Sequence, residues 1–288
     1  MLTFIVNPMA GNGHALKVEQ QLKEALDNKG VDYRILHTER PGHATELARS
    51  AAEAKDCRGV VSVGGDGTAY EVACGLMNTG MPMGIIPAGT GNDFIKSVNI
   101  PRNPMKALDL VLSMKARPVD VGGINERLFL NVCGTGFDVT VLDYTLAAKK
   151  YVRGILPYLI GLVRGIAHYA PVHVRFTADG VTEERDVLIC SVANGKYFGG
   201  GIPICPEAKA DDGKLDLVVV ENKPRWMIPF YLPSLLMGRV LKFPFTMHKK
   251  VERVELFSKG MRLNADGEVS VVDEVQFRIL NGALTLFW

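Results

Sequence analysis

The chain has 288 residues, and its 33 Lys and Arg residues against 31 Asp and Glu residues give a formal net charge of +2 at pH 7. This length permits one large domain or two modest ones, each with a full hydrophobic core. The balance of charge excludes a protein that is basic overall, so no nucleic-acid partner is expected and any basic surface must be local.

The first 114 residues alternate apolar strands with amphipathic helices. In chain order we predict a strand at 2–6, a helix that ends at Gly30, a strand at 31–37, a helix at 44–55, a strand at 59–63, a helix from Thr68, a strand at 83–87 and a helix at 104–114. This alternation predicts a parallel sheet with helices on both faces. Ligands of such sheets bind beyond the carboxyl ends of the strands, where the turns after the first, third and fourth strands are rich in glycine and polar residues.

The most informative of these turns is the sequence GGDGT at 64–68, which follows a β-branched strand and opens a helix. Its glycines let backbone N–H groups approach an anion, and the helix start adds partial positive charge. The Asp66 carboxylate would repel a phosphate unless it first meets a metal ion or a hydroxyl. We therefore predict a nucleotide-phosphate site that works through Mg²⁺, the alternative being a Gly-Asp-Gly turn without a ligand.

After about Pro118 strands follow one another with few helices between them. We predict strands at 119–124, 127–133, 172–178, 186–193, 215–220 and 253–257. Two helical insertions, at about 139–168 and 225–238, interrupt them. This pattern predicts a second, mostly antiparallel domain, either a β-sandwich or a barrel.

Two windows of this second half, 144–178 and 222–251, contain no Asp or Glu but keep Lys, Arg and aromatic residues. Basic residues mixed with exposed aromatics are typical of surfaces that face anionic lipid. The alternative is that the apolar residues are core and the acid gaps are chance. We predict a membrane-facing surface that includes Lys149, Lys150, Arg153 and Trp226.

Other features narrow the class of protein. The five cysteines contain no C-x-x-C pair and the six histidines show no ligand spacing, which favours reduced thiols over disulfides or a zinc site. No secretion signal is evident, and the longest apolar run, 154–163, is about half the length of a membrane span. A P-loop motif is absent, and the Rossmann fingerprint fails because Leu16 stands where its third glycine belongs.

Taken together, GGDGT and the later GIIPAGTGNDF at 84–94 resemble the catalytic domain of the diacylglycerol kinase family, to which soluble bacterial lipid kinases and sphingosine kinases are similar. The likeness also covers Asn7-Pro8, Thr38, residues 206–217 and residues 263–268. The resemblance implies a three-layer α/β nucleotide-binding domain with a parallel sheet at 1–122 and an antiparallel β-sandwich lipid-acceptor domain with helical insertions at 123–282. Residues 283–288 are expected to pack back on the first domain.

The resemblance also implies roles for individual residues. ATP is expected to be lined by Asn7, Thr38, Gly64, Gly65, Asp66, Gly67, Thr68, Gly89, Thr90 and Asn92. Asp66 and Asp93 are expected to organise the catalytic Mg²⁺, and Glu268 to act as the general base for the acceptor hydroxyl. A second, structural Mg²⁺ is expected at Lys209, Asp212 and Lys214.

The implied activity is transfer of the γ-phosphoryl group of ATP to the hydroxyl of a membrane lipid, most simply one like diacylglycerol. The expected location is the cytoplasm, with peripheral attachment to an anionic inner membrane face, and an exposed edge of the β-domain would support a homodimer. Two alternatives remain open from sequence: phosphorylation of a soluble acceptor in the manner of an NAD kinase, and a nucleotide- or lipid-binding regulator without turnover. The sequence does not identify the lipid.

Overall fold

The computed structural model describes residues 1–149, 151–152 and 156–288, and its chain forms two compact units. Unit 1 comprises Met1–Val121, Lys209–Gly213 and Leu280–Trp288, and unit 2 comprises Gly122–Ala208 and Lys214–Ile279. The architecture confirms the predicted fold class: unit 1 is an α/β domain and unit 2 is a β-rich domain with helical insertions.

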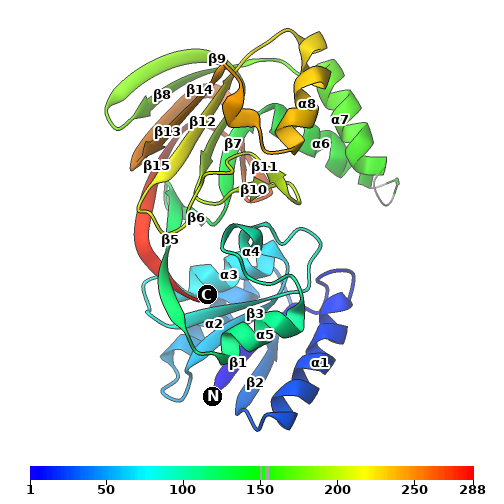
Figure 1. The fold of residues 1–288 in the computed structure, drawn as a ribbon, viewed down its shortest axis with the longest axis vertical. Helices are drawn as coiled ribbons and strands as arrows, with labels where there is room; N and C mark the ends of the chain where they lie inside the picture. Colours follow the sequence, from blue (N-terminus) through cyan, green and yellow to red (C-terminus); the bar gives the residue numbers. More distant parts are fainter. Residues whose placement is uncertain (150, 153–155) are drawn as a thin grey trace. The chain divides into compact units, whose positions relative to one another are not determined.

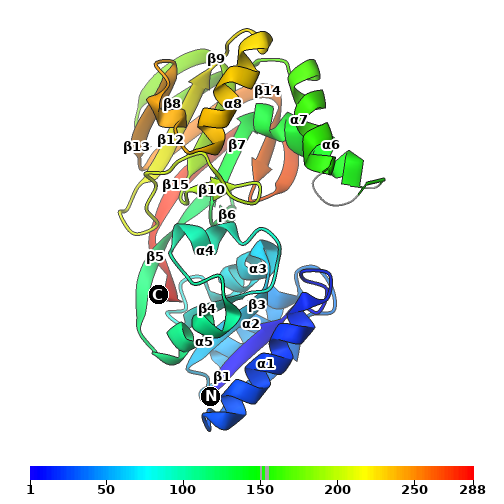
Figure 2. The ribbon, with the colours of Figure 1, turned by 45° about the vertical axis from the view of Figure 1, so that its right-hand side comes forward.

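Unit 1 is built on a parallel sheet between two layers of helices. Its strands are β1 (Leu2–Val6), β2 (Tyr33–His37), β3 (Gly59–Gly64), β4 (Pro82–Pro87) and the end of β15 (Glu268–Phe287). Its helices are α1 (His14–Asn28), α2 (His43–Glu53), α3 (Asp66–Leu76), α4 (Asp93–Ser97) and α5 (Pro104–Leu112). In Figures 1 and 2, α1 and α5 lie on one face of this sheet, and α2 and α3 lie on the other.

The strand order of unit 1 is β2–β1–β3–β4–β15, with every neighbouring pair parallel. The chain moves outward from β1 to β2 and then returns to place β3 on the other side of β1. In open parallel sheets this reversal creates a crevice beyond the carboxyl ends of the two strands, and ligands bind there. The topology therefore points to the ends of β1 and β3, where Asn7 and Gly64 lie.

Unit 2 is an antiparallel sandwich. Its strands are the end of β5 (Ala116–Ile124), β6 (Arg127–Phe129), β7 (Val132–Gly136), β8 (Val172–Ala178), β9 (Val181–Ala193), β10 (Tyr197–Phe198), β11 (Ile202–Pro203), β12 (Leu215–Glu221), β13 (Thr246–Val251), β14 (Arg253–Ala265) and the start of β15. The order β13–β12–β9–β7–β14–β15 is joined by β8, which pairs with both β9 and β14. Strands β9, β7, β14 and β8 consequently close on themselves.

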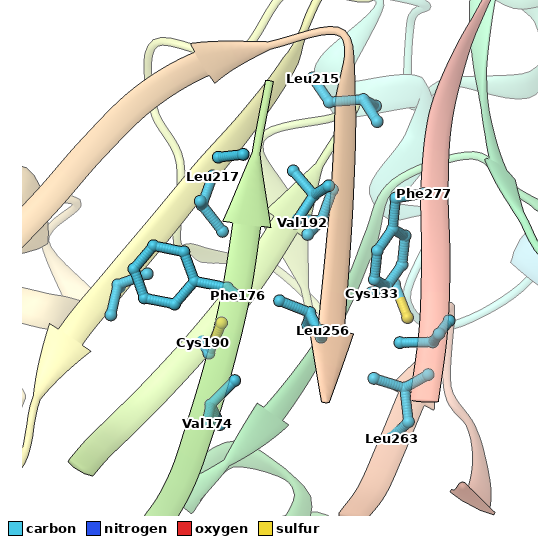
Figure 3. Close-up of a cluster of buried hydrophobic side chains, with 14 of the residues drawn as sticks. Cys133, Val174, Phe176, Cys190, Val192, Leu215, Leu217, Leu256, Leu263 and Phe277 are labelled. Atoms are coloured by element: carbon cyan, nitrogen blue, oxygen red, sulfur yellow. The ribbon is translucent and has the colours of Figure 1, made fainter. Parts of the chain in front are cut away.

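Apolar side chains from these strands fill the interior of unit 2. Figure 3 shows Phe176 of β8, Leu217 of β12, Leu256 of β14 and Phe277 of β15 converging in this cluster, and each is at most 2% exposed. Because alternate residues of a strand point to the same face, the period of two in β8 and β14 produces this core directly.

Two helical insertions cover a second apolar cluster of unit 2. The first contains α6 (Phe137–Lys149) and α7 (Leu156–His168), and the second contains the 3₁₀ turns η1 (Arg225–Met227) and η2 (Val240–Lys242) with α8 (Ile228–Leu236) between them. Leu162 and Ile166 of α7 pack on the same cluster as Tyr231 and Leu235 of α8. Among the described residues, no helix has the length and apolar character needed to cross a membrane.

The structure differs from the predicted strands at several places. Strand β13 and the short pair β10–β11 were not predicted, and β14 runs to Ala265, beyond the predicted end at 257. Strand β15 was not predicted; Gly282 adopts a φ of 57° within it, yet the strand continues through this residue. The strand predicted at 127–133 is divided into β6 and β7. The Asp266 carboxylate accepts hydrogen bonds from the backbone N–H groups of Leu130, at 2.5 Å, and Asn131, at 3.0 Å. These two N–H groups are therefore not available for hydrogen bonds to a neighbouring strand.

The division into units also differs from the predicted domains, which placed residues 209–213 and 280–282 in the second domain. Asp120 explains the difference. Its backbone N–H donates to the Ala210 carbonyl at 2.7 Å, and its two carboxylate oxygens accept from the N–H groups of Gly213 and Gly282, both at 2.8 Å. One buried aspartate thus holds three segments of unit 1 together.

Candidate functional site

The GGDGT turn lies at the end of β3 and the start of α3, as predicted. Thr68 packs so closely on Gly64 that a Cβ on Gly64 would lie 2.4 Å from Thr68 Oγ1. Asn7, at the end of β1, donates from Nδ2 to Thr68 Oγ1 at 3.2 Å, and its backbone N–H donates to the Val63 carbonyl at 3.0 Å. The predicted residues Asn7 and Thr68 therefore meet at the reversal of strand order.

The turn after β4 packs against the GGDGT turn. The N–H groups of Ala88 and Gly89 both donate to the Gly64 carbonyl, at 2.7 and 3.0 Å. A Cβ on Gly89 would lie 2.4 Å from Gly65 Cα, so only glycine permits this approach. Gly11, in the turn after β1, packs equally closely on the Ala88 carbonyl, where a Cβ would approach to 2.3 Å. Three predicted loops thus contact one another at one edge of the sheet.

Asp66 joins two of these loops through its side chain. Its Oδ1 accepts the N–H of Asp93 at 2.6 Å and the N–H of Phe94 at 3.2 Å, which caps the short helix α4. Burial raises the pKa of Asp66, and the charge of Asp93 raises it further, while the backbone N–H bonds act in the opposite direction. The sequence predicted a ligand role for this carboxylate but did not reveal its capping role.

Asp93 itself is buried, and its Oδ1 pairs with Lys96 Nζ at 2.6 Å. Carboxylate oxygens are the ligands that Mg²⁺ prefers, and a dication near Asp66 would offset both causes of the raised pKa of that group. The residues present therefore fit a magnesium ion at Asp66. Because Lys96 occupies one oxygen of Asp93, an indirect role through water fits Asp93 better than two-oxygen ligation.

The remaining predicted nucleotide residues of unit 1 lie at the same loop ends. Thr38 follows β2 and donates its backbone N–H to the Val6 carbonyl at 2.9 Å. Thr90 is exposed, whereas the Asn92 side chain closes its own loop by donating to the Gly89 carbonyl at 2.8 Å. Gly67 stands exposed in the first turn of α3, with no atom within 4 Å of an added Cβ.

Glu268 lies in unit 2, at the tight turn between β14 and β15. Its Oε2 pairs with the Arg127 guanidinium at 2.5 Å, and both side chains are more than half exposed. The preceding Asp266 adopts a φ of 47°, and its carboxylate binds three consecutive N–H groups, from Leu130 to Val132. Sequence reasoning did not single out Asp266, although an Asp-Gly pair at a hairpin is a signal for this conformation.

The predicted second metal set falls in one short segment. Lys209 and Asp212 belong to unit 1 and are exposed, and Lys214, the first residue after the boundary, forms an ion pair with Glu252 at 2.6 Å. The carboxylate that orders this segment from within unit 1 is Asp120, which the sequence analysis missed. A single Asp inside an otherwise apolar strand is the sequence feature that could have pointed to Asp120.

Of the predicted membrane-facing residues, Trp226 is 70% exposed at the start of the second insertion. It contacts Phe230, which is 73% exposed, in an edge-to-face arrangement with ring centroids 6.4 Å apart. Lys149 is the last residue of α6, while Lys150 and Arg153 lie outside the described residues. Further large apolar side chains are exposed on α7, at the end of α8 and directly after it: Leu156, Leu159, Val163, Leu236 and Met237.

Two family models, curated relatives and solved structures match this chain over most of its length. The model of the diacylglycerol kinase catalytic domain matches residues 1–124, and that of the YegS C-terminal NAD kinase beta sandwich-like domain matches residues 131–288. A diacylglycerol kinase of Mycobacterium tuberculosis is 30% identical over 275 residues, which cover 93% of this chain and 88% of that protein. A Pseudomonas fluorescens protein named "Probable lipid kinase YegS-like" is 32% identical over 264 residues, covering 91% and 87%.

A solved structure shares the complete fold. The crystal structure of a diacylglycerol kinase from Bacillus anthracis aligns with a TM-score of 0.73 and 25% identity, covering 100% of this chain and 96% of that one. The alignment over the full length includes both units.

Proposed function

The chain belongs to the diacylglycerol kinase family, and we propose that this lipid kinase uses ATP and Mg²⁺ to phosphorylate the hydroxyl of a membrane lipid like diacylglycerol. The observation that carries the proposal is the contact of three glycine-containing loops at the reversal of strand order in unit 1, with a carboxylate, Asp66, among them. Phosphoryl transfer requires mainly positioning and neutralisation of charge, and this arrangement supplies both.

In this proposal the loops of unit 1 hold the triphosphate. Gly64 and Gly89 let the loops pack closely, Gly67 places no Cβ over the first turn of α3, and the N-terminus of the 11-residue helix α3 lies at the GGDGT turn that contains Gly65. Asn7, Thr38, Thr68, Thr90 and Asn92 complete the nucleotide site. Asp66 would hold Mg²⁺ with Asp93 acting through water, and the ion, when bound, would neutralise charge on the phosphoryl oxygens.

Glu268 is the proposed base that takes the proton from the acceptor hydroxyl. To do so it must exchange Arg127 for that hydroxyl. Because both side chains are more than half exposed, the ion pair contributes only about 0–1 kcal/mol of stability. Breaking it to bind the hydroxyl therefore requires little free energy. Asp266 fixes the turn that carries Glu268, and it is a positioning residue in this scheme.

A lipid acceptor is supported by the exposed apolar surface of unit 2. Helices α7 and α8 pack on one core cluster, and Arg225 donates to the Ala167 carbonyl at the end of α7 at 3.1 Å. Their outward side chains include Leu159 and Val163 of α7 and Phe230 of α8. Large exposed apolar side chains beside basic residues such as Arg164 suit peripheral binding to the anionic inner face of a membrane. We assign Trp226 to this surface; Lys150 and Arg153 lie outside the described residues.

The segment 209–214 is proposed as a second, structural Mg²⁺ site. It would use the Asp212 carboxylate with the backbone carbonyls of Lys209 and Lys214. Hard oxygen donors of this kind suit Mg²⁺, and Asp120 already fixes the backbone on one side.

The deciding experiment measures transfer of labelled phosphate from γ-labelled ATP by the purified protein. Mixed micelles containing diacylglycerol, other hydroxyl lipids or no lipid are compared with soluble NAD as acceptor, with and without a chelator. The proposal predicts labelled lipid only when Mg²⁺ is present. Labelled NAD would instead identify a soluble-acceptor kinase, and ATP binding without transfer to any acceptor would identify a regulator.

A further inference from the structure

Unit 2 contains a buried group of three potential metal ligands that the kinase reaction does not use. The donor atoms of Cys205, Asp216 and His248 all lie within 4.8 Å of one another. Cys205 and Asp216 are fully buried, whereas the His248 side chain is 20% exposed and leaves a path from solvent. We propose that these residues form a binding site for a divalent transition-metal ion, with Zn²⁺ as the best match.

One ring nitrogen of His248 faces both other ligands. His248 Nε2 lies 2.6 Å from Asp216 Oδ1 and 3.9 Å from Cys205 Sγ. On a tetrahedral zinc with a Zn–S bond of about 2.3 Å and a Zn–N bond of about 2.0 Å, sulfur and nitrogen are roughly 3.6 Å apart. The sulfur–nitrogen pair therefore needs to move little. The nitrogen–oxygen pair must open to roughly 3.4 Å as the metal replaces the proton that the two atoms share.

The other oxygen of Asp216 is a second, independent indication of a missing cation. Asp216 Oδ2 is buried and has no hydrogen-bond partner among the described residues, and Lys250 Nζ lies 3.7 Å away. A buried carboxylate oxygen without a hydrogen bond is costly, and a bound ion would satisfy it.

The surroundings of His248 also match a metal site. Its other nitrogen, Nδ1, lies 3.9 Å from Glu207 Oε2. Histidines that bind metal through one nitrogen commonly donate the other N–H to a carboxylate, which fixes the ring orientation. Glu207 is exposed and can close this distance by rotation, so it is placed as a positioning residue.

The protons that the ligands must lose limit the affinity of the site for a metal ion. Burial raises the pKa of Cys205 to about 12, so the sulfur is a thiol when no metal is present. Binding of Zn²⁺ releases the thiol proton to solvent and requires the imidazole proton to sit on Nδ1, facing Glu207, which leaves thiolate, carboxylate and neutral imidazole around a dication. The two negative ligands balance its charge. A sulfur, a nitrogen and an oxygen select zinc or cobalt, in contrast to the oxygen donors proposed for Mg²⁺.

Sequence spacing could not reveal this site, because its ligands come from three separated segments. Cys205 follows β11, Asp216 lies on β12 and His248 lies on β13. The β12–β13 pairing places Val218 opposite His248 and Asp216 opposite Lys250, so Asp216 and His248 are diagonal neighbours on adjacent strands. The absence of a C-x-x-C motif excluded only the commonest zinc pattern.

The test uses the complete protein, stripped with a chelator and titrated with Zn²⁺ against a chromophoric competitor. Co²⁺ is then substituted and its absorption spectrum recorded. One equivalent of bound zinc and a thiolate-to-cobalt charge-transfer band are expected. Cys205→Ala should abolish the band and weaken Zn²⁺ binding more than Glu207→Gln, which should weaken it by about 10- to 100-fold.

Cys190→Ala is the matched control, since Cys190 is equally buried in unit 2 but lies in the apolar core cluster. It should leave both the band and the zinc affinity unchanged. Should the Cys205 variant fail to fold, the cobalt spectrum of the unaltered protein decides by itself. No charge-transfer band, no zinc binding, or equal zinc affinity of the Cys205 and wild-type proteins would overturn the site and leave an Asp–His ion pair beside a thiol. Kinase activity enters none of these outcomes.

Discussion

The Asp66 carboxylate accepts the backbone N–H of Asp93 at 2.6 Å, so one side chain connects the loop after β3 to the loop after β4. This geometry separates two contributions of Asp66. Asparagine keeps an acceptor oxygen for the N–H groups but loses the charge, whereas alanine loses both. We expect Asp66→Asn to fold normally with turnover reduced at least about 100-fold, and Asp66→Ala to lose a further 0.5–2 kcal/mol of stability, roughly that of a helix cap.

Urea unfolding and initial rates of phosphoryl transfer check both variants. Glu71→Gln is the matched control, because Glu71 also caps a helix by accepting the N–H groups of Gly42 and Ala44. Near-normal turnover of Asp66→Asn would refute the metal role of Asp66.

Two glycines of the loops should respond differently to alanine. An added Cβ on Gly89 would meet Gly65 Cα at 2.4 Å, while an added Cβ on Gly67 meets no atom within 4 Å. Gly89→Ala should therefore lower the melting temperature and the affinity for ATP together. Gly67→Ala lies in the first turn of α3 and should leave stability unchanged or raise it by up to about 1 kcal/mol. Equal stability of the two variants in a thermal melt would contradict the loop contact.

Glu268→Gln should reduce kcat by about 10²- to 10⁴-fold, the usual contribution of a general base, with ATP affinity unchanged. Glutamine keeps the size of the side chain and cannot accept the proton. Glu274→Gln, an exposed change on the same strand β15, serves as control. Steady-state kinetics with ATP and lipid varied separately give kcat and KM. An unaltered kcat would reassign the base.

The paired rings of Trp226 and Phe230 should control attachment to membranes. Replacing Phe230 with Ser removes about 1.5–3 kcal/mol of burial if the ring enters the lipid, which is about ten-fold or more in the partition coefficient. Trp226→Ser should have a comparable effect. Sedimentation with vesicles of anionic lipid measures the bound fraction. Val271→Ser, an equally exposed apolar position on β15, should bind normally; if it loses as much binding as Phe230→Ser, the membrane surface is misplaced.

Asp138 should make unit 2 less stable as pH rises. Burial raises the pKa of this carboxyl to about 6 from a value of 3.8, and its Oδ1 has no hydrogen-bond partner among the described residues. Because the folded state holds the proton more tightly than the unfolded state, stability is fully present below pH 4 and falls between about pH 4 and 6. The loss is at most about 3 kcal/mol.

Asp138→Asn cannot ionise, so it should be more stable than the natural chain at pH 7 and equal to it near pH 4. Urea unfolding across this range measures the difference. Glu126→Gln, on the exposed turn between β5 and β6, should show no such dependence. A difference that grows toward low pH would have the wrong sign and contradict the burial of Asp138.

The sequence predicted unit 1 well because its strands and helices are periodic and its loops carry glycines with local roles. Gly64 and Gly89 could be recognised from their motifs alone. Residues that act over long range could not be recognised. Asp120, which joins segments 93 and 162 residues away, and Asp266, which divides β6 from β7, depend on partners that no local pattern identifies. Strand β15 was missed for the same reason, since its end pairs with β4, a strand far earlier in the chain.

Unit 1 is discontinuous along the chain: residues Leu280–Trp288 supply the strand beside β4. During synthesis, the first 121 residues leave the ribosome long before this strand exists. The parallel sheet can be completed only after the residues of unit 2 have been made, so β4 remains an open edge while unit 2 is being synthesised. A nascent chain that stops before Leu280 should therefore expose that edge, and a chain that includes Leu280–Trp288 should close it.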